Sequence, residues 1–345
     1  MAAIKATPDF IHRPAAHCES GTTSSLLHHH GLPASEPLVF GIGAGIYFGY
    51  FPFIKIYGAP FITYRNTPGS IFKKTARRFN VHFEIYRFKE QQKAMDALDS
   101  ALDRGLAVGL QTGVYWLPYM PEAMRFHFNA HNLIVYGKKG DDYLISDPVL
   151  DTPVVCPSND LLKARFAEGF LAPRGKMYYI SHLPEPDWID IPQAVRQGIK
   201  DSCRAMVNTP FPLVGVRGIR TFAKSLRKWP VKFPKRRVPL YIGHTIRMQE
   251  EIGTGGGGFR LMYAAFLQEA AHILQDDRLL ELSKRMDAIG DRWREFAVYG
   301  ARICKNRSTD GENIDLLCDI LLDCAQREQQ LFKDLGKIRN APPPN

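Results

Sequence analysis

The chain has 345 residues, of which 45% are apolar and 23% charged, values typical of a globular protein with one large or two ordinary domains. Wholesale disorder is therefore excluded. Six cysteines without a CxxC pair exclude a disulfide-dense scaffold and argue against a structural zinc site, so no metal is expected.

The positive charge is concentrated in one segment. The formal net charge is +10 at pH 7, and residues 202–249 contain eleven Lys or Arg residues but no Asp or Glu. One basic region indicates one kind of partner: an acidic protein, a phosphate-bearing ligand, nucleic acid or an anionic membrane surface. The alternative is a solvated basic face whose counter-charges lie elsewhere in the fold.

Residues 1–183 alternate between helix and strand patterns. In chain order these patterns first predict a helix over 17–30, a helix start at Ser35, a buried strand-and-turn region over 37–54 and a helix over 67–80. A strand over 81–88, a helix over 89–104, a strand over 106–111 and an irregular aromatic loop over 114–129 follow. The last predicted elements of this part are a hairpin of strands 131–137 and 143–147, a helix over 159–168 and a strand over 177–182. Gly31 and Gly105 are the predicted helix stops.

The pattern changes after residue 183. Pro184, Pro186 and Pro192 indicate a linker. Helices are then predicted over about 191–207, 259–275, 277–300 and 311–336, followed by a loose tail over 341–345. The expected class is α+β, with an α/β domain over 1–183 and an all-α domain over 184–340 that begins with the basic stretch.

Two features bear on location. The start, MAAIKATPDF, has no apolar core, so no secretory signal is predicted and a reducing, cytoplasmic setting is expected. Residues 37–54 carry no charge, but four glycines and Pro52 interrupt this apolar run. A buried strand and turn is therefore favoured over a transmembrane span.

Cys18 is the strongest candidate for a reactive residue. It lies in the first turn of the helix predicted over 17–30, where the partial positive charge of a helix N-terminus favours thiolate over thiol. A catalytic thiolate also needs a base, which can be distant in sequence. The alternative is that Cys18 is a small buried apolar residue.

The predicted hairpin supplies a base and an acid. If its turn centres near Lys139, His131 and Asp147 lie opposite each other on neighbouring strands, with Cβ atoms about 4.5–5.5 Å apart. A carboxylate there can hold one imidazole nitrogen while the other faces the thiol. The order Cys, His, Asp along the chain is the papain-like order. The alternative for His131 is an ordinary strand histidine with satisfied hydrogen bonds.

Several short motifs occur in order along the chain: His17-Cys18-Glu19-Ser20, Leu26-Leu27, Gly31, Ser35-Glu36, Phe40-Gly41-Ile42-Gly43, Phe48, Ala130-His131-Asn132 and Asp147-Pro148. In this combination, over roughly 11–183, they resemble the N-terminal domain of the butirosin-biosynthesis protein H family. The later half resembles the uncharacterised helical domain that often accompanies it, through Gly253 to Tyr263 and Trp293-Arg294.

The resemblance implies a papain-like fold related to bacteriocin-leader cysteine peptidases. The founding member of the family is an acyltransferase that moves an aminoacyl group from a carrier-protein thioester to an amine of an aminoglycoside. By this resemblance Cys18 is the nucleophile, His131 the base and Asp147 the orienting acid. The implied function is transfer of an acyl group from a phosphopantetheine thioester, through a Cys acyl-enzyme, to a small-molecule amine or hydroxyl acceptor in secondary-metabolite or lipid-like product biosynthesis. No permanently bound cofactor is expected.

Further residues are candidates for supporting roles. Papain-like enzymes place an oxyanion-hole Gln six residues before the Cys; His12 stands there in this chain, so His12, His17 and the Cys18 backbone N–H are the candidate donors. The acyl-pocket candidates are Trp116, Tyr119 and Phe126. An acidic acyl carrier protein is the expected partner, and its candidate docking residues are Arg217, Arg220, Lys224, Arg227, Lys228, Arg236 and Arg237.

Two alternatives stay open. The same triad with water as acceptor would make the chain a cysteine hydrolase: a peptidase, amidase or thioesterase. In the other alternative the N-terminal half is inactive, and the basic region is a non-catalytic module that binds nucleic acid or lipid. Tight binding of a DNA oligomer that weakens steeply with salt would favour this module, whereas the acyl-transfer interpretation expects no nucleic acid.

Overall fold

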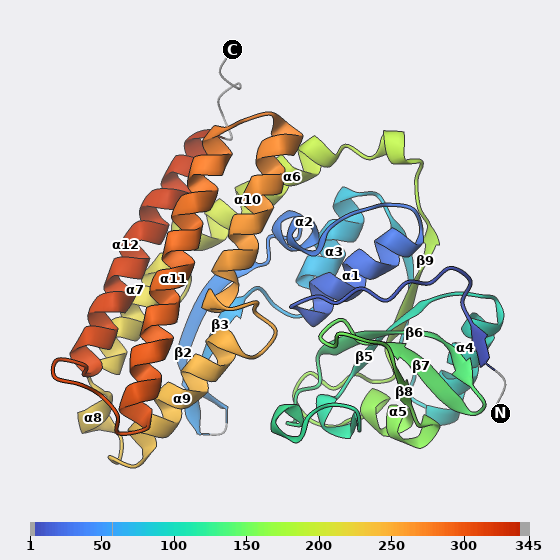
Figure 1. The fold of residues 1–345 in the computed structure, drawn as a ribbon, viewed down its shortest axis with the longest axis horizontal. Coiled ribbons are helices and arrows are strands. Elements are labelled where there is room, and N and C mark those ends of the chain that lie inside the picture. Colours follow the sequence, from blue (N-terminus) through green and yellow to red (C-terminus); the bar gives the residue numbers. More distant parts are fainter. Residues whose placement is uncertain (1–3, 57, 339–345) are drawn as a thin grey trace. The chain divides into compact units, whose positions relative to one another are not determined.

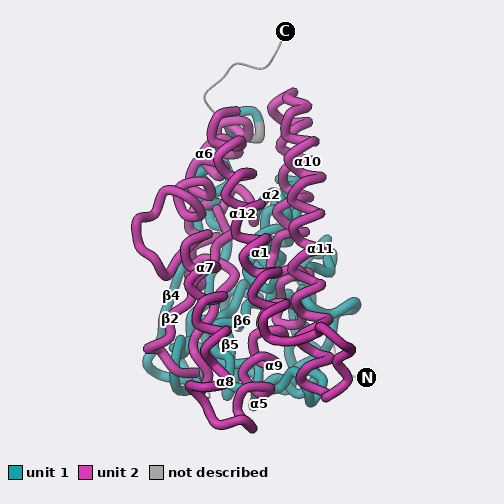
Figure 2. Tube along the Cα trace, turned by 90° about the vertical axis from the view of Figure 1, so that its left-hand side faces the viewer, with its two compact units in different colours: residues 1–39, 75–189 teal, residues 40–74, 190–345 magenta. Residues whose placement is uncertain are grey.

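The computed structural model describes residues 4–56 and 58–338, which form two compact units (Figure 2). Unit 1 consists of residues 1–39 and 75–189, and unit 2 of residues 40–74 and 190–345. The units therefore differ from the contiguous division into 1–183 and 184–340 that the sequence predicts. The chain passes from unit 1 to unit 2 for the last time after residue 189, close to the predicted boundary. Residues 40–74, which the prediction assigns to the N-terminal domain, belong to unit 2.

Unit 1 combines helices with a seven-stranded antiparallel sheet (Figure 1). Its helices are α1 (Cys18–His29), α4 (Gln91–Asp103) and α5 (Ser158–Arg165). Its strands are β1 (Ile4–Ala6), β4 (His82–Tyr86), β5 (Val108–Thr112), β6 (His131–Lys139), β7 (Asp142–Ser146), β8 (Val154–Cys156) and β9 (Met177–His182). The sheet order is β4-β9-β5-β6-β7-β8, with β1 also paired to β6. The predicted α+β class is confirmed.

Side-chain alternation along the strands separates two faces of the sheet. Leu133 and Val135 of β6 belong to a core that α4 and α5 cover. Alternation turns Asn132 to the other face, where α1 packs against β6 and β9. Residues 18–27 of α1 are all buried, so this helix is a central element of the unit although six of these ten residues are polar.

Two helices contain residues of both units, because a boundary between the units falls inside each of them: α2 (Glu36–Ile42) and α3 (Ser70–Arg78). The predicted helix start at Ser35 is confirmed, because its hydroxyl accepts a hydrogen bond from the Leu38 backbone N–H at 3.1 Å. In the uncharged run 37–54, residues 37–42 belong to α2, and the predicted strand is present from Ile46, buried at its start and exposed at residues 53 and 54. None of the helices in the described ranges is long and apolar enough to cross a membrane.

Unit 2 is a helical bundle that also contains a hairpin. The hairpin strands are β2 (Ile46–Ile56) and β3 (Ala59–Arg65). The helices are α6 (Ile191–Cys203), α7 (Gly215–Leu226), α8 (Trp229–Lys232), α9 (Arg237–Glu250), α10 (Arg260–Leu274), α11 (Arg278–Cys304) and α12 (Ile314–Ile338). The ring of Phe48 lies 5.8 Å from that of Trp293 and 6.2 Å from that of Phe222, and this packing explains why the hairpin clusters with the helices.

Three helices that carry the basic stretch, α7, α8 and α9, are absent from the sequence-based prediction. A signal was present in α7: Ile219, Phe222 and Leu226 recur at intervals of three and four residues, and all three are buried. The surrounding cations hid this periodicity.

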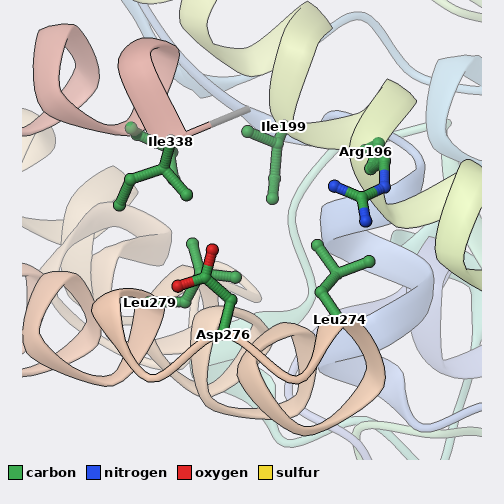
Figure 3. Close-up of a pocket in the computed structure, with 7 residues that line it drawn as sticks. Arg196, Ile199, Leu274, Asp276, Leu279 and Ile338 are labelled. Atoms are coloured by element: carbon green, nitrogen blue, oxygen red, sulfur yellow. The ribbon is translucent and has the colours of Figure 1, made fainter. Parts of the chain in front are cut away.

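Two hollows lie away from the candidate residues. A cavity of about 10 Å³ in unit 2, lined by Arg196, Leu274, Asp276 and neighbouring aliphatic side chains, has room for about one water molecule (Figure 3). A larger hollow of about 430 Å³ in unit 1 includes Lys138, at the opposite end of β6 from His131.

Candidate active site

Cys18 is the first residue of α1, as the sequence predicts. The residue before it, His17, caps the helix: its Nδ1 accepts a hydrogen bond from the Ser20 backbone N–H at 3.4 Å and lies 2.8 Å from the Ser20 hydroxyl. The sulfur therefore lies at the positive end of a 12-residue helix, an environment that favours a thiolate.

Glu36 holds the segment that leads into Cys18. Its carboxylate accepts hydrogen bonds from the backbone N–H groups of Ala16 (2.9 Å) and His17 (2.7 Å) and from the Ser20 hydroxyl (3.1 Å). Burial raises the pKa of this carboxyl, while the three hydrogen bonds favour its charged form. The sequence indicated Glu36 only as a first-turn residue of the next helix, so this clamp was missed.

His131 and Asp147 meet at one end of the sheet. His131 begins β6, and Asp147 directly follows β7. Nε2 of His131 donates to Oδ2 of Asp147 at 2.7 Å, since a carboxylate can only accept. The same oxygen accepts the Tyr119 hydroxyl at 3.0 Å, and Oδ1 accepts the Val149 backbone N–H at 3.3 Å. The acid is thus fixed by three hydrogen bonds.

The predicted register of the hairpin is wrong, although the pair still forms. Lys139 pairs with Asp142, so the turn is Gly140-Asp141, and an irregularity between Val135 and Gly137 shifts the register once more. Asp147 therefore continues the ladder beside residue 133, and His131 is its diagonal neighbour. Diagonal neighbours lie within reach of a ring and a carboxylate, which is why the contact survives.

Cys18 completes the constellation through a hydrogen bond to the imidazole of His131. Burial lowers the pKa of His131, but the charge and hydrogen bond of Asp147, with smaller contributions from Cys18, outweigh burial and raise that pKa to about 10. The imidazole is therefore charged near neutral pH. A charged imidazole beside a sulfur at a helix N-terminus is the arrangement that stabilises a thiolate–imidazolium pair.

Stability should depend on pH through His131. A group whose pKa is higher in the folded chain stabilises the fold fully below its unfolded value, near 6.5, and this contribution is lost as the pH rises through about 10. We expect the free energy of unfolding, measured in urea, to fall across that window. In Asp147→Asn the fall should be much smaller, because the main raising charge is gone. An equal fall in both proteins would contradict the pairing.

Close packing ties the start of α1 to the loop that carries Asp147. The Ala15 backbone N–H donates to the Pro148 carbonyl at 2.6 Å. Gly21 lies against the same two residues: a Cβ placed on it would come within 2.5 Å of the Ala15 Cβ and 2.8 Å of the Pro148 Cβ. Only glycine permits this approach, so Gly21 contributes to bringing the cysteine and the acid together.

The two predicted oxyanion donors have other roles in the structure. His12 places Nδ1 2.8 Å from the Ser146 hydroxyl and donates from Nε2 to the Leu150 carbonyl at 3.1 Å, so both its ring nitrogens are engaged in holding the Asp147 segment. Donation from His12 to a substrate would require one of these hydrogen bonds to break, and this role stays a prediction. His17 uses Nδ1 for capping, and donation to a substrate would have to come from its Nε2. The Cys18 backbone N–H stays a predicted donor.

One predicted pocket residue, Tyr119, is reassigned. Its hydroxyl binds Asp147, which makes it a positioning residue. Trp116 is exposed and forms an edge contact with Tyr115, with ring centroids 5.2 Å apart. Phe126 lies 6.1 Å from Phe128 between ring centroids. A pocket role for Trp116 and Phe126 stays a prediction.

Tyr119→Phe tests the reassignment. Removing the hydroxyl takes one hydrogen bond from a buried carboxylate, so we expect kcat to fall about tenfold while KM for the acyl donor is unchanged. Tyr115→Phe makes the same change at an exposed tyrosine of the same loop, so it is the control and should leave kcat unchanged. A raised KM with kcat preserved in Tyr119→Phe would instead support the pocket role predicted from the sequence.

The candidate docking residues lie in unit 2 and differ in their contacts. Arg220 hydrogen bonds to Gln329, and Arg227 forms ion pairs with Asp315 (2.8 Å) and Asp319 (2.9 Å) of α12. These two are therefore tied to the bundle. The exposed candidates are Arg217, Lys224, Arg227, Lys228, Arg236 and Arg237. In the described part of the chain, no group of three or more His, Cys, Asp or Glu side chains is placed to hold a metal ion.

Two family descriptions match the chain. Butirosin biosynthesis protein H, N-terminal, matches residues 17–148, which include all three members of the constellation. Domain of unknown function (DUF4872) matches residues 159–335, just over half of the chain. The resemblance inferred from the short motifs is confirmed.

Comparison with solved structures gives a remote likeness. A protein from Bacillus anthracis named as a C39-like peptidase is similar with a TM-score of 0.36 and 12% identity, over 52% of this chain and 99% of that one. No curated protein matches the sequence. Unit 1 itself has the papain-like arrangement that the sequence predicts, a central helix headed by a cysteine against an antiparallel sheet that carries the histidine.

Proposed function

Since the chain belongs to the DUF4872 family and carries a butirosin biosynthesis protein H N-terminal domain, we propose that it is a cysteine acyltransferase. In this proposal Cys18, His131 and Asp147 transfer an acyl group from the phosphopantetheine thioester of a carrier protein to a small-molecule amine or hydroxyl. The thioester is a substrate, and the chemistry needs no resident cofactor.

The proposed first half-reaction forms an acyl-enzyme. The Cys18 thiolate attacks the thioester carbonyl and forms a C–S bond, giving a tetrahedral intermediate. When this intermediate collapses, the bond to the pantetheine sulfur breaks, and His131 gives its proton to the leaving thiolate. His131 is then neutral and can act as a base. Asp147 holds the ring in one orientation and stabilises its charged form.

The second half-reaction returns the enzyme to its starting state. The acceptor nitrogen or oxygen attacks the acyl carbonyl while His131 takes its proton. Collapse of the second intermediate breaks the bond to Cys18 and releases the thiolate beside the charged imidazole. The products are the acylated acceptor, an amide or ester, and the resting ion pair.

The observation that carries the proposal is the hydrogen-bonded connection of Cys18 to His131 and of His131 to Asp147. Enclosure favours transfer over hydrolysis, because Cys18 exposes 6% of its surface, His131 4% and Asp147 0%. A site that admits little water protects an acyl-enzyme. Arg217 and Lys224, seven residues apart on α7, are exposed, and so is Lys228 just after the helix; these cations would suit an acidic carrier protein.

Intact-mass analysis after mixing the full chain with acyl-loaded carrier protein tests this proposal. We expect a mass gain equal to the acyl group, absent in Cys18→Ala and retained in Cys156→Ala. Cys156 is the matched control because it is buried and burial raises its pKa to about 12. Release of free acid without acceptor would favour the hydrolase, and no adduct with any acyl group would contradict covalent catalysis.

A further inference from the structure

One end of unit 2 presents apolar and basic side chains together. The tip of the β2–β3 hairpin meets α8 and the start of α9 there (Figure 1). The ring of Phe233 has two lysines near it, with Lys55 Nζ 5.5 Å and Lys232 Nζ 5.8 Å from its centroid. The ring of Phe233 also contacts the ring of Tyr241 of α9, with centroids 5.1 Å apart. We call this surface the end patch and define it by Phe53, Lys55, Val231, Lys232, Arg236 and Leu240.

The apolar members of the end patch are exposed to an unusual degree. Val231 exposes 94% of its surface, and Phe53 and Leu240 each expose 68%. They come from β2, α8 and α9, and in each of these elements a residue close to them in sequence, Lys55, Lys232 or Tyr241, contacts the ring of Phe233. Leu240 lies four residues after Arg236, so these two side chains share one exposed face of α9. Large apolar side chains exposed together in this way mark an interaction surface.

The charge of the end patch has one sign. Neither of the two segments that build it, 37–65 and 202–249, contains an Asp or Glu. Within the described ranges, the ion pairs of the basic stretch involve Arg227 and Arg247, which are not members of the end patch. Lys55, Lys232 and Arg236 therefore face solvent beside exposed aliphatic and aromatic groups.

We propose that the end patch docks on the surface of an anionic phospholipid bilayer. Phe53, Val231 and Leu240 enter the boundary between headgroups and acyl chains, and the three cations contact lipid phosphates. Lys and Arg suit such a site because their apolar stems can lie along the boundary while the charged ends stay at the headgroups. This docking is peripheral and does not depend on the acyl-transfer proposal.

The side-chain chemistry favours a bilayer over two other anionic partners. Nucleic acid would engage the cations but would leave Val231 and Leu240 exposed, because aliphatic side chains give bases no stacking platform. A folded acidic protein would have to bury lysines among the apolar contacts, whereas lysine is depleted in protein–protein interfaces. A bilayer can accommodate both kinds of side chain, the cations at the headgroups and the apolar groups at the boundary with the acyl chains.

Vesicle cosedimentation with the full chain tests the inference. We expect binding to vesicles of phosphatidylcholine containing about one third phosphatidylserine, weak binding to phosphatidylcholine alone, and loss of binding as salt increases. Reversing three charges in Lys55→Glu, Lys232→Glu, Arg236→Glu should weaken binding by roughly 100-fold or more. The triple change Phe53→Ser, Val231→Ser, Leu240→Ser should also abolish sedimentation although it keeps every charge.

Matched controls separate the end patch from bulk charge and apolar content. Lys200→Glu, Lys284→Glu, Lys333→Glu makes the same charge change on other exposed sites of unit 2, and should sediment like the parent. Phe170→Ser, Trp188→Ser removes exposed apolar groups from unit 1 and should do the same. All the substituted side chains are exposed, and unfolding curves in urea confirm that each variant is folded.

Two results would overturn the inference. One is equal vesicle binding by the parent and both end-patch variants. The other is no vesicle binding by the parent together with a gel shift of a DNA oligomer or an acidic carrier protein that the charge variant loses. Because these assays do not involve Cys18, Cys18→Ala should bind vesicles like the parent whether or not acyl transfer occurs.

Discussion

Asp147→Asn is expected to lower kcat for acyl transfer by about 10³–10⁴-fold, with little change in KM for the acyl donor. Asp147 accepts Nε2–H of His131 and supplies the main charge that keeps the imidazole protonated in a buried site. An amide at this position removes the charge and can also offer an N–H to the ring, which would turn the imidazole or change its tautomer. Either effect separates the sulfur from a correctly protonated partner.

Single-turnover acylation measures this loss directly. Mixing the variant with acyl-loaded carrier protein and following the adduct by mass separates acylation from the later transfer step. Asp151→Asn is the matched control, since Asp151 is an exposed residue of the same loop. Acylation by Asp147→Asn at the rate of the parent would show that Asp147 has only a structural role.

Arg260→Met is expected to destabilise unit 2 by about 3–5 kcal/mol. Arg260 and Glu328 are both fully buried, and the guanidinium donates to the two carboxylate oxygens at 2.9 and 3.0 Å. Trp293 Nε1 donates to the same carboxylate at 2.7 Å. Removing only the cation leaves a buried carboxylate with a single indole donor, and most of the cost arises from that uncompensated charge.

The double variant Arg260→Met, Glu328→Met should recover much of the loss, because a neutral pair of similar volume leaves no buried charge. Midpoints of urea unfolding, compared between variants with the same m-value, give the difference in the free energy of unfolding. Arg227→Met, which breaks an exposed pair with Asp315 and Asp319, should cost far less. Equal destabilisation by Arg260→Met and Arg227→Met would contradict the buried-charge explanation.

The glycine run before α10 shows how local sequence supports this buried pair. Gly255 to Gly258 and then Phe259 all have positive φ angles. Successive left-handed residues require glycine almost throughout, which the sequence suggested only as slack before a helix. The same turn places the Gly258 carbonyl 2.7 Å from Nη1 of Arg260 and brings Gly258 against the ring of Tyr64. The run thus gives the guanidinium one of its buried acceptors.

Local sequence patterns predict most elements of unit 1 and the order of the three candidate groups along the chain. A helix pattern with a glycine stop predicted α1 to within one residue at each end and placed Cys18 in its first turn. Period-two alternation fixed the hairpin, so that His131 and Asp147 fell at its open end. Motifs of adjacent residues carried the family resemblance. All of these depend on interactions within a few residues of the chain, which local pattern can specify.

The contacts that hold these elements together became visible in the folded chain. The clamp by Glu36, the close approach at Gly21 and the hydrogen bond from Tyr119 join residues that local periodicity does not relate. The hairpin register changed through an irregularity at β6, where β1 also pairs. The β2–β3 hairpin joined unit 2 because Phe48 packs against Phe222 and Trp293, far along the sequence. Such contacts are selected by complementary shape and buried charge across the folded chain, and a residue's neighbours in sequence do not encode them.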